Sequence, residues 1–244
     1  MNMITSTLLA AGFSLLAGSA AAQTCVANNC AALGFTKSAD NCEGDIIRCP
    51  FDTSKVFCKE KVYDPKPGAI LYSDGTISDS VIASKTPVGI VAYVNGSTGF
   101  AVALTESNQT WGGYGYNVSC LGDMDSGVAS ADMNGRVNTQ CLVSDSQTHP
   151  AANYCNTFSA VSSGKGSSGW YLPAAGELKA MSYSYGAINL GLQKLSKTQI
   201  SSSYYWSSSE SNANYGAWYV RPSDGDMGYS SKTVSKPVRC VLAL

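Results

Sequence analysis

The stretch that decides the fold is GWYLPAAGEL, residues 169–178. Trp170–Leu172 is a short apolar run that predicts a strand, and Pro173 stands just before AAGELKAMSYS, where proline favours the start of a helix. Glu177 then falls in the first turn of that helix, where the macrodipole stabilises a negative charge. We therefore interpret Glu177 as a first-turn charge rather than a catalytic acid.

Strands dominate on the amino-terminal side of this stretch. The predicted strands are Ala69–Tyr72, Pro87–Val94 and Phe100–Leu104, the last two joined as a hairpin by a Gly-containing turn. Residues 105–147 are polar and Gly-rich, so we expect long loops there. Pro150–Val161 predicts a helix that carries Cys155.

Strands return on the carboxyl-terminal side, after a second helical stretch at roughly Ala187–Leu195. The predicted strands are Tyr204–Ser208, Ala217–Val220, about Gly225–Tyr229, and Pro237–Leu242. Strands, then two or three helices, then strands again is the order of an α+β fold with a mainly antiparallel sheet.

Composition excludes several classes of function. Only 14% of the 244 residues are charged and the formal net charge is −1, which argues against a nucleic-acid binder and against a charge-driven membrane-surface protein. The hydrophobic fraction of 44% is too high for a disordered chain. His149 is the only histidine, which leaves little room for a Ser–His–Asp enzyme or a His-rich metal site.

The amino-terminal residues predict export. Residues 1–22 contain an apolar run followed by small residues, with Ala20 and Ala22 at an A-x-A cleavage site, so we interpret them as a signal peptide. The alternative is a retained membrane anchor, but the run is short for a spanning helix. After cleavage we expect no membrane insertion and a secreted or cell-surface location.

Nine cysteines fit an oxidising compartment. Five of them fall in residues 23–60, which we interpret as a disulfide-stapled stalk module, with CPFDTSKVFC, residues 49–58, as a turn-rich loop closed by a bridge. Zinc is the alternative, but no cysteine pair has the spacing of a zinc knuckle. An odd count leaves one thiol free or paired with another chain. Residues 59–68 read as a linker, and residues 61–244 as the larger domain.

An ordered series of motifs in the larger domain resembles a known family. The motifs are ILYSDGT (70–76), FAVALTE (100–106), GWYLPAAGEL (169–178), YYWSSSE (204–210), AWYV (217–220) and VRCVLAL (238–244). Together they resemble the domain at the carboxyl end of Legionella collagen-like adhesin, the Lcl C-terminal domain family, and the related Fibrobacter-type major paralogous domains of bacterial surface proteins. The resemblance covers roughly residues 66–244 and implies a C-type lectin-like fold.

That resemblance also implies a disulfide pattern. C-type lectin-like domains tie their first helix to their last strand, which implies Cys155–Cys240 here and leaves Cys120–Cys141 as the remaining pair of the domain. Related formylglycine-generating enzymes use a cysteine pair late in the domain. Here only Cys240 is late, and it is assigned to a bridge, so we expect no enzyme and no cofactor.

Residues 201–236 resemble the variable region of proteins diversified by bacterial diversity-generating retroelements. The segment is crowded with Ser, Tyr, Asn, Asp and Gly, with Trp206 and Trp218 as apolar anchors that we expect in the core. Antibody paratopes use the same residue types, because Tyr supplies rigid contact area and Ser, Gly and Asn adapt their hydrogen bonds. The resemblance implies these ligand-facing residues: Asn212, Asn214, Tyr215, Tyr219, Arg221, Ser223, Asp224, Asp226, Tyr229 and Ser230.

Two stretches carry weak calcium candidates. Asp123, Asp125, Asp132 and Asn134 place oxygen ligands at alternate positions, but neither stretch completes a calcium loop with its terminal Glu. We favour the alternative that these residues make turns through their own backbone, and expect no metal.

The sequence thus predicts an exported binding protein, an adhesin or receptor, with a glycan or a cell-surface protein as its ligand. A structural subunit of a pilus or surface assembly is the alternative, in which the same residues contact a neighbouring copy. The leftover cysteine is compatible with such a homo-oligomer. A secreted hydrolase is the third reading, and Glu106, Glu177 and Glu210 are its candidate carboxylates.

Overall fold

The computed structural model describes residue 30 and residues 37–38, 45–50, 52–59 and 65–244, and the statements below concern these residues. The chain divides into two compact units, Met1–Val62 and Tyr63–Leu244. The expected signal peptide, residues 1–22, lies outside the described residues.

The first unit contains a small antiparallel sheet in the order β1-β3-β2, with β1 at Lys37–Ser38, β2 at Asp45–Arg48 and β3 at Lys55–Lys59. Cys49 forms a disulfide with Cys30. The expectation of a loop closed between Cys49 and Cys58 is therefore wrong. Cys58 lies within β3, opposite Ile46 of β2, so this run is a turn followed by a paired strand rather than a closed loop.

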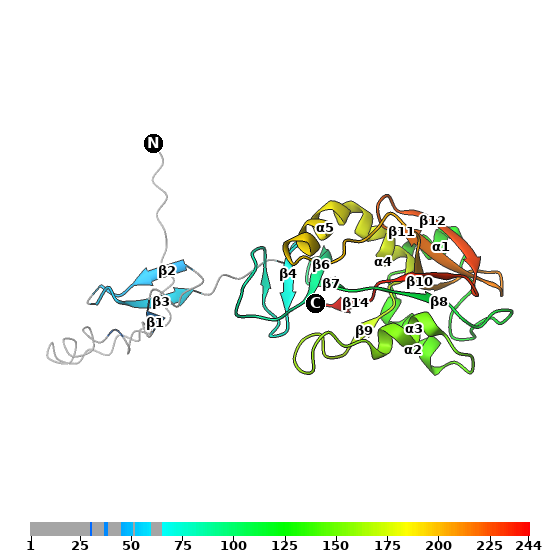
Figure 1. Cartoon of the computed structure of the whole chain (residues 1–244), viewed down its shortest axis with the longest axis horizontal. Coiled ribbons are helices and arrows are strands. Elements are labelled where there is room, and N and C mark those ends of the chain that lie inside the picture. Colours follow the sequence, from blue (N-terminus) through cyan, green and yellow to red (C-terminus); the bar gives the residue numbers. More distant parts are fainter. Residues whose placement is uncertain (1–29, 31–36, 39–44, 51, 60–64) are drawn as a thin grey trace, which may run out of the picture. The chain divides into compact units, whose positions relative to one another are not determined.

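The larger unit is built on a six-stranded sheet in the order β5-β4-β6-β7-β14-β9, antiparallel throughout (Figure 1). Its strands are β4 (Ile70–Tyr72), β5 (Ile77–Ser78), β6 (Pro87–Asn95), β7 (Thr98–Ala103), β9 (Trp170–Tyr171) and β14 (Val241–Ala243). The hairpin expected from residues 87–104 is the β6–β7 pair, closed at Asn95↔Thr98.

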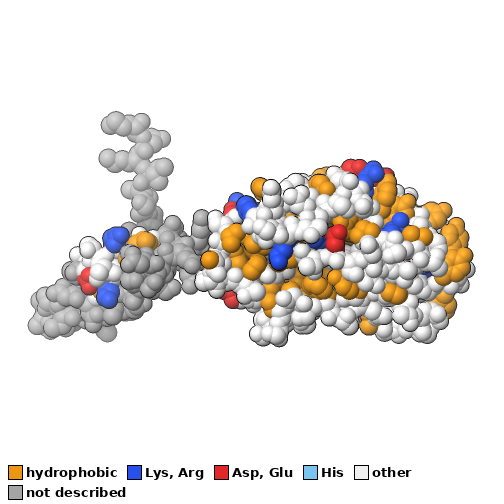
Figure 2. Space-filling model, in the orientation of Figure 1, with side chains coloured by type: hydrophobic (Ala, Val, Ile, Leu, Met, Phe, Trp, Pro, Cys, Tyr) orange, Lys and Arg blue, Asp and Glu red, His pale blue; other side chains and the backbone are white. Residues whose placement is uncertain are grey.

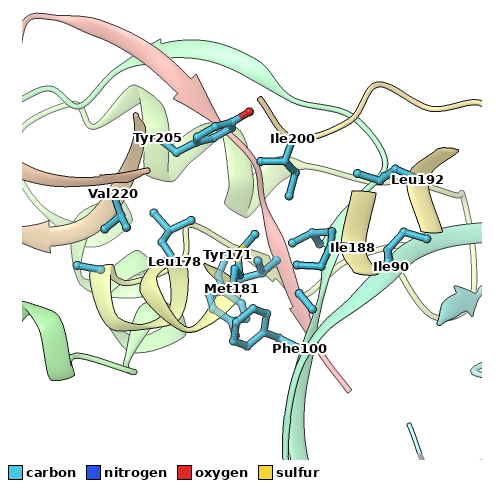
Figure 3. Close-up of a cluster of buried hydrophobic side chains, with 14 of the residues drawn as sticks. Ile90, Phe100, Tyr171, Leu178, Met181, Ile188, Leu192, Ile200, Tyr205 and Val220 are labelled. Atoms are coloured by element: carbon cyan, nitrogen blue, oxygen red, sulfur yellow. The ribbon is translucent and has the colours of Figure 1, made fainter. Parts of the chain in front are cut away.

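Two hydrophobic clusters cover the two faces of this sheet, because successive side chains of a strand point to opposite sides. Phe100 and Val102 of β7 belong to one cluster, and Ala101 and Ala103 belong to the other. The first cluster also contains side chains of α4 (Ala175–Ala180) and α5 (Tyr185–Lys194), joined by the short helix η2 (Met181–Ser184) (Figure 3). The second contains side chains of α2 (Gly135–Ser144) and α3 (Pro150–Thr157).

A second sheet of three antiparallel strands lies beside α2 and α4, and α4 in turn contacts α1 (Ser126–Ala131). Its strands are β10 (Tyr205–Glu210), β11 (Gly216–Arg221) and β12 (Asp226–Ser231). The single strand expected at Pro237–Leu242 is instead two strands that join different sheets. β13 (Ser235–Val238) pairs with β8 (Ser107–Thr110), and β14 enters the six-stranded sheet.

The expectation of long loops at residues 105–147 is wrong, since β8, α1 and α2 fall there. Their Ser-, Gly- and Asn-rich sequences have low intrinsic helix propensity. Tertiary contacts stabilise them instead. The side chain of Asp125 caps α1 by accepting from the Val128 amide at 2.9 Å, and a disulfide joins Cys120 to Cys141 of α2. Fold class α+β with mainly antiparallel sheets is confirmed.

Candidate functional site

The three-stranded sheet β10–β11–β12 positions the residues of the segment 201–236. Its two tryptophans anchor it, as expected: Trp206 is fully buried and Trp218 is 6% exposed. Trp206 Nε1 donates to the Val234 carbonyl at 3.1 Å, and Trp218 Nε1 donates to the Met124 carbonyl at 3.0 Å. Both indole N–H groups are therefore satisfied inside the protein, and the tryptophans serve the core.

Strand alternation divides the predicted ligand-facing residues between two faces of this sheet. Val220 and Trp218 of β11 point toward the first hydrophobic cluster, and Tyr219 and Arg221 point the other way. On β12, Asp226 and Ser230 pair with Arg221 and Ala217, so they share the face of Tyr219. Tyr229 pairs with Trp218, and its ring lies 5.6 Å from the indole, so it belongs to the opposite face.

The face that carries Tyr219 combines aromatic rings with cations; we call Tyr204, Tyr219, Arg221 and Lys236 the cationic face. Tyr204 and Tyr219 meet edge to face with ring centroids 4.7 Å apart. The Arg221 guanidinium lies 4.9 Å from the Tyr204 ring, and Lys236 Nζ lies 4.3 Å from the Tyr219 ring. Each cation is thus placed for a cation–π contact.

Acidic side chains fix the position of Arg221. Its Nε donates to both carboxylate oxygens of Asp224 at 3.0 and 2.9 Å, and its Nη2 donates to Asp226 at 3.2 Å. This pairing lowers the pKa of Asp224 and raises the pKa of Arg221. The hydroxyl of Tyr204 also donates to Asp226, at 2.7 Å. The cationic face is therefore ordered before any ligand arrives.

The β10–β11 turn and strand β12 carry one exposed tyrosine each, Tyr215 and Tyr229; we call this part of the sheet the tyrosine edge. Tyr215 is 43% exposed and Tyr229 is 48% exposed. Their phenols interact, which raises the pKa of Tyr215 above its ordinary value. Asn214 Nδ2 donates to the carbonyl of Gly115 at 3.5 Å, which brings a second segment, residues 112–118, to this edge.

The remaining predicted ligand-facing residues lie in turns. Asn212 is exposed in the turn between β10 and β11, and Ser223 and Asp224 lie in the turn between β11 and β12. The structure thus places the ten predicted residues on two faces and two turns of one small sheet. All ten are partly or fully exposed.

The four calcium candidates act as turn and capping residues. Asp125 caps α1, and Asn134 takes the N-cap position of α2. Asp123 accepts from the side chain of Asn117 at 3.4 Å. Buried Asp132 accepts from the Asn134 amide and from two further side chains. Within the part of the chain that the structure describes, no group of three or more His, Cys, Asp or Glu is placed to hold a metal ion.

A buried polar network links the sheet to the helices. Asp132 Oδ2 accepts from Ser209 Oγ at 2.6 Å and from Asn138 Nδ2 at 2.8 Å. Close by, Glu177 accepts from the Ala174 amide at 2.8 Å and from the Tyr171 hydroxyl at 3.1 Å. Burial raises the pKa of Glu177 to about 7, and the charge of Asp132 adds to the shift. Glu177 thus lies in the first turn of α4 and holds its start to β9.

The sole histidine is also enclosed. His149 is fully buried, and its Nε2 lies 2.9 Å from Asp145 Oδ2. Its ring meets Trp111 edge to face at 5.0 Å. His149 is therefore packed beside α3, at the position of its N-cap.

Both disulfides implied for the larger unit are present in the structure. Cys155 of α3 bonds to Cys240, which lies between β13 and β14, and Cys120 bonds to Cys141 of α2. The first ties α3 to the chain segment that crosses from one sheet to the other.

Sequence reasoning missed the residue that holds the tyrosine edge together. Lys232 and Glu210 are fully buried, and Lys232 Nζ lies 2.5 Å from Glu210 Oε1. Lys232 lies in a polar run, GYSSKTVSK, residues 228–236, and no local signal in it indicates burial. Tyr204 and Lys236 were also missed, although both are close in sequence to residues that were named.

The face of the larger unit seen in Figure 2 carries few charges. In Figure 2, uncharged and hydrophobic groups cover most of the visible face of the larger unit, and charged groups are isolated. No helix within the described residues is long and apolar enough to span a membrane.

A solved structure shares the fold. A fimbrial protein from Bacteroides ovatus superimposes with a TM-score of 0.62 at 20% sequence identity. The similarity covers 75% of this chain and 50% of that chain, so this chain spans half the length of the fimbrial protein. No curated protein matches the sequence.

A family comparison identifies the region that contains the site. Residues 119–242 match the family described as the Lcl C-terminal domain. The match includes α1 to α5, the three-stranded sheet and both disulfides of the larger unit, whereas residues 66–118 of the expected resemblance lie outside it. The chain belongs to the Lcl C-terminal domain family.

Proposed function

We propose that this protein is an exported bacterial surface protein that acts as an adhesin or receptor. Its ligand would be a glycan or a cell-surface protein, bound through the residues of the three-stranded sheet and its turns. The observation that carries the proposal is the cationic face, where partly exposed aromatic rings and an ordered guanidinium lie together on one sheet. Family membership and the fimbrial neighbour support a surface location.

The finer fold assignment belongs to the same proposal. A C-type lectin-like fold ties its first helix to its last strand. Here the Cys155–Cys240 bridge joins α3, which follows α1 and α2, to the segment before β14, so it supports that assignment at the last strand but not at the first helix. In this fold the ligand surface is carried by loops and short strands near the carboxyl end, which agrees with the position of β11 and β12.

The chemistry of the cationic face suits polar ligands. Tyr219 and Tyr204 offer ring faces and edges, and Arg221 retains donors beyond those committed to Asp224 and Asp226. A positively charged guanidinium beside partly exposed tyrosines can stack on a sugar ring or bind an acidic side chain of a protein. Enzyme activity, a cofactor, nucleic-acid binding and membrane insertion form no part of the proposal.

The binding test uses the full exported chain on glycan and surface-protein arrays. Arg221→Ala removes the ordered cation, and Tyr219→Ala removes the ring beneath Lys236, so we expect each to weaken binding about tenfold or more. Lys165→Ala is the control, since Lys165 lies in the Gly/Ser loop far along the chain from these strands. Unchanged binding in both surface variants would overturn the proposed site.

Retroelement diversification is a further part of the proposal and has its own test. Deep sequencing of the codons for residues 201–244 across the cell population measures it directly. We expect substitutions concentrated at adenines in the codons for residues such as Asn212, Asn214 and Tyr215. A uniform sequence would leave an adhesin with a fixed ligand.

A structural subunit of a pilus or surface assembly is the second candidate, and the fimbrial neighbour favours it. In that case the same surface contacts another copy of the chain. Light scattering of the purified protein separates the two. Concentration-dependent oligomers that Arg221→Ala abolishes, together with no foreign ligand, would support the subunit role.

A further inference from the structure

The side chain of Lys232 lies in a closed cage of oxygen atoms. Lys232 follows β12 and is fully buried. Its Nζ donates to Glu210 Oε1 and to the Tyr116 carbonyl, both at 2.5 Å, and to the Asn214 carbonyl at 2.9 Å. The Gly113 carbonyl lies 3.4 Å away. One carboxylate and three carbonyls thus surround a single positive charge.

This cage joins two segments that are about a hundred residues apart in sequence. Glu210 also accepts from the Val118 amide through both carboxylate oxygens, at 3.0 and 3.3 Å. The Lys232 backbone continues the connection: its carbonyl accepts from the Trp111 amide at 3.0 Å, and its amide donates to the Tyr215 carbonyl at 2.8 Å. The Trp111 ring lies 4.9 Å from Nζ and closes one side of the cage.

The donor set is one that proteins use for metal ions. Calcium takes carboxylate and backbone carbonyl oxygens in flexible arrangements, often in loops. Here the ammonium group of Lys232 supplies the positive charge instead. Because Lys232 directly follows β12 in the chain, this charge cannot dissociate from the site. The site is therefore filled from within the chain and neutralises Glu210 without a dissociable ion.

Exposed tyrosines surround the segments that the cage joins. Tyr114 is 62% exposed and Tyr116 is 37% exposed, and both come from residues 112–118. Tyr215 and Tyr229 contribute from the sheet edge, and the phenols of Tyr114 and Tyr229 both influence the titration of Tyr215. We call Tyr114, Tyr116, Tyr215 and Tyr229 the tyrosine surface.

We propose that Lys232 is the positioning cation of the tyrosine surface, and that this surface stacks on a neutral saccharide without a bound metal ion. The proposal rests on the binding function proposed above and deepens it. It names the ligand class, adds Tyr114 and Tyr116 from outside residues 201–236, and assigns a role to a buried pair.

Charge favours a neutral ligand over an anionic one. The lysine that holds these loops is buried, and its charge is matched by Glu210, so it offers nothing to a sulfate or a carboxylate. Exposed Asp123 acts electrostatically on Glu210, so negative charge lies near the same edge. Tyrosine rings bind the C–H faces of sugars, and their hydroxyls hydrogen-bond to sugar hydroxyls.

The test titrates the full exported chain with cellohexaose, mannohexaose and maltoheptaose by calorimetry in the presence of EDTA. We expect at least one of these neutral oligomers to bind, and Tyr114→Ala and Tyr215→Ala each to weaken that binding about tenfold or more. Tyr183→Ala is the matched control, because Tyr183 is 89% exposed on η2, outside the surface, and its loss should change nothing.

A second variant tests the positioning role. Lys232→Ala leaves the oxygen cage without its cation, so we expect binding to fall about tenfold or more in EDTA and to recover when Ca²⁺ is added. Wild-type binding should respond to neither EDTA nor Ca²⁺. Near-ultraviolet circular dichroism shows whether Lys232→Ala folds. If it does not fold, the inference is tested by the binding of the tyrosine variants and by the insensitivity of wild-type binding to EDTA.

Several results would overturn the inference. They are loss of wild-type binding in EDTA, full binding by Lys232→Ala in EDTA, binding only to a heparin hexasaccharide or a protein, and no binding to the neutral oligomers. If Tyr114→Ala binds normally while Arg221→Ala does not, this inference fails and the proposed function stands. If no glycan or protein ligand is found on any surface, the proposed function fails as well.

Discussion

At the scale of single residues, Glu177 links the stability of the fold to pH. Its folded pKa of about 7 lies above the ordinary value of 4.5, so the folded state holds the proton more tightly than the unfolded chain. The contribution of Glu177 to stability is therefore fully present below about pH 4.5 and is lost as pH rises through about 7. The loss over this range is of order 3 kcal/mol.

Glu177→Gln should remove this pH dependence. Glutamine keeps the acceptor for the Ala174 amide and never ionises, so the variant should gain stability relative to wild type as pH rises from 5 to 8. Urea unfolding at several pH values measures the difference. If the free energy of unfolding changed with pH equally in the two proteins, Glu177 would be shown to ionise in the folded state at little cost.

The two Lys/Arg–carboxylate pairs of the site should differ sharply in their contribution to stability. Breaking a buried pair leaves an unpaired charge in the interior, so Lys232→Met should cost about 3–5 kcal/mol. Arg221→Met removes a partly exposed cation, whose side chain is 30% exposed, and should cost much less. Denaturant unfolding of both variants compares them. Equal costs would contradict the burial argument.

These residues also mark the limit of sequence reasoning. Trp206 and Trp218 were predicted to be core residues because large aromatics among polar residues anchor a sheet, and both are buried. The Lys232–Glu210 pair was not predictable, because the carbonyls that make burial of the lysine tolerable come from Gly113 and Tyr116. Such long-range polar contacts leave no local pattern in the sequence.

At the scale of elements, the distribution of apolar residues predicted the strands but not the helices of residues 105–147. Pro87–Val94 is apolar almost throughout and matches β6 closely. The segments SGVASA and GRVNTQCLVS, by contrast, have a composition typical of loops, yet they form α1 and α2. Capping by Asp125 and the Cys120–Cys141 bridge override their weak propensity.

Helix α5 offers a matched pair of glycines. A side chain at Gly191 would lie 2.6 Å from the Gly68 carbonyl and 2.8 Å from Ile90, whereas one at Gly186 would meet nothing within 4 Å. Gly191→Ala should therefore destabilise the fold by about 1–3 kcal/mol. Gly186→Ala should stabilise it by about 0.5 kcal/mol through helix propensity. Thermal unfolding tests the sign of each change.

The two disulfides of the larger unit should differ in strength. Cys155–Cys240 joins residues 85 apart and Cys120–Cys141 joins residues 21 apart. The chain-entropy model gives about 4.5 kcal/mol for the longer loop and about 3 kcal/mol for the shorter one. Paired Cys→Ala variants, compared by guanidinium unfolding, should follow this order. The reverse order would mean that native packing around α2 outweighs loop entropy.

At the scale of the whole molecule, the division at Val62 predicts independent folding of the larger unit. A fragment of residues 63–244 contains both of its hydrophobic clusters and both of its disulfides. It should unfold cooperatively at the same denaturant concentration as the corresponding transition of the full chain. Loss of cooperative unfolding in the fragment would show that the first unit contributes to its stability.

The strand order of the six-stranded sheet has a consequence for biosynthesis. Strand β14 lies between β7 and β9, although it is synthesised long after both of them. Until β14 leaves the ribosome, β7 and β9 have no partner between them, and Cys155 has no cysteine at position 240 to bond with. The nascent chain therefore cannot close its sheet early. The β7–β14 and β14–β9 pairings, and the bridge to Cys240, form only after synthesis has reached the last strand.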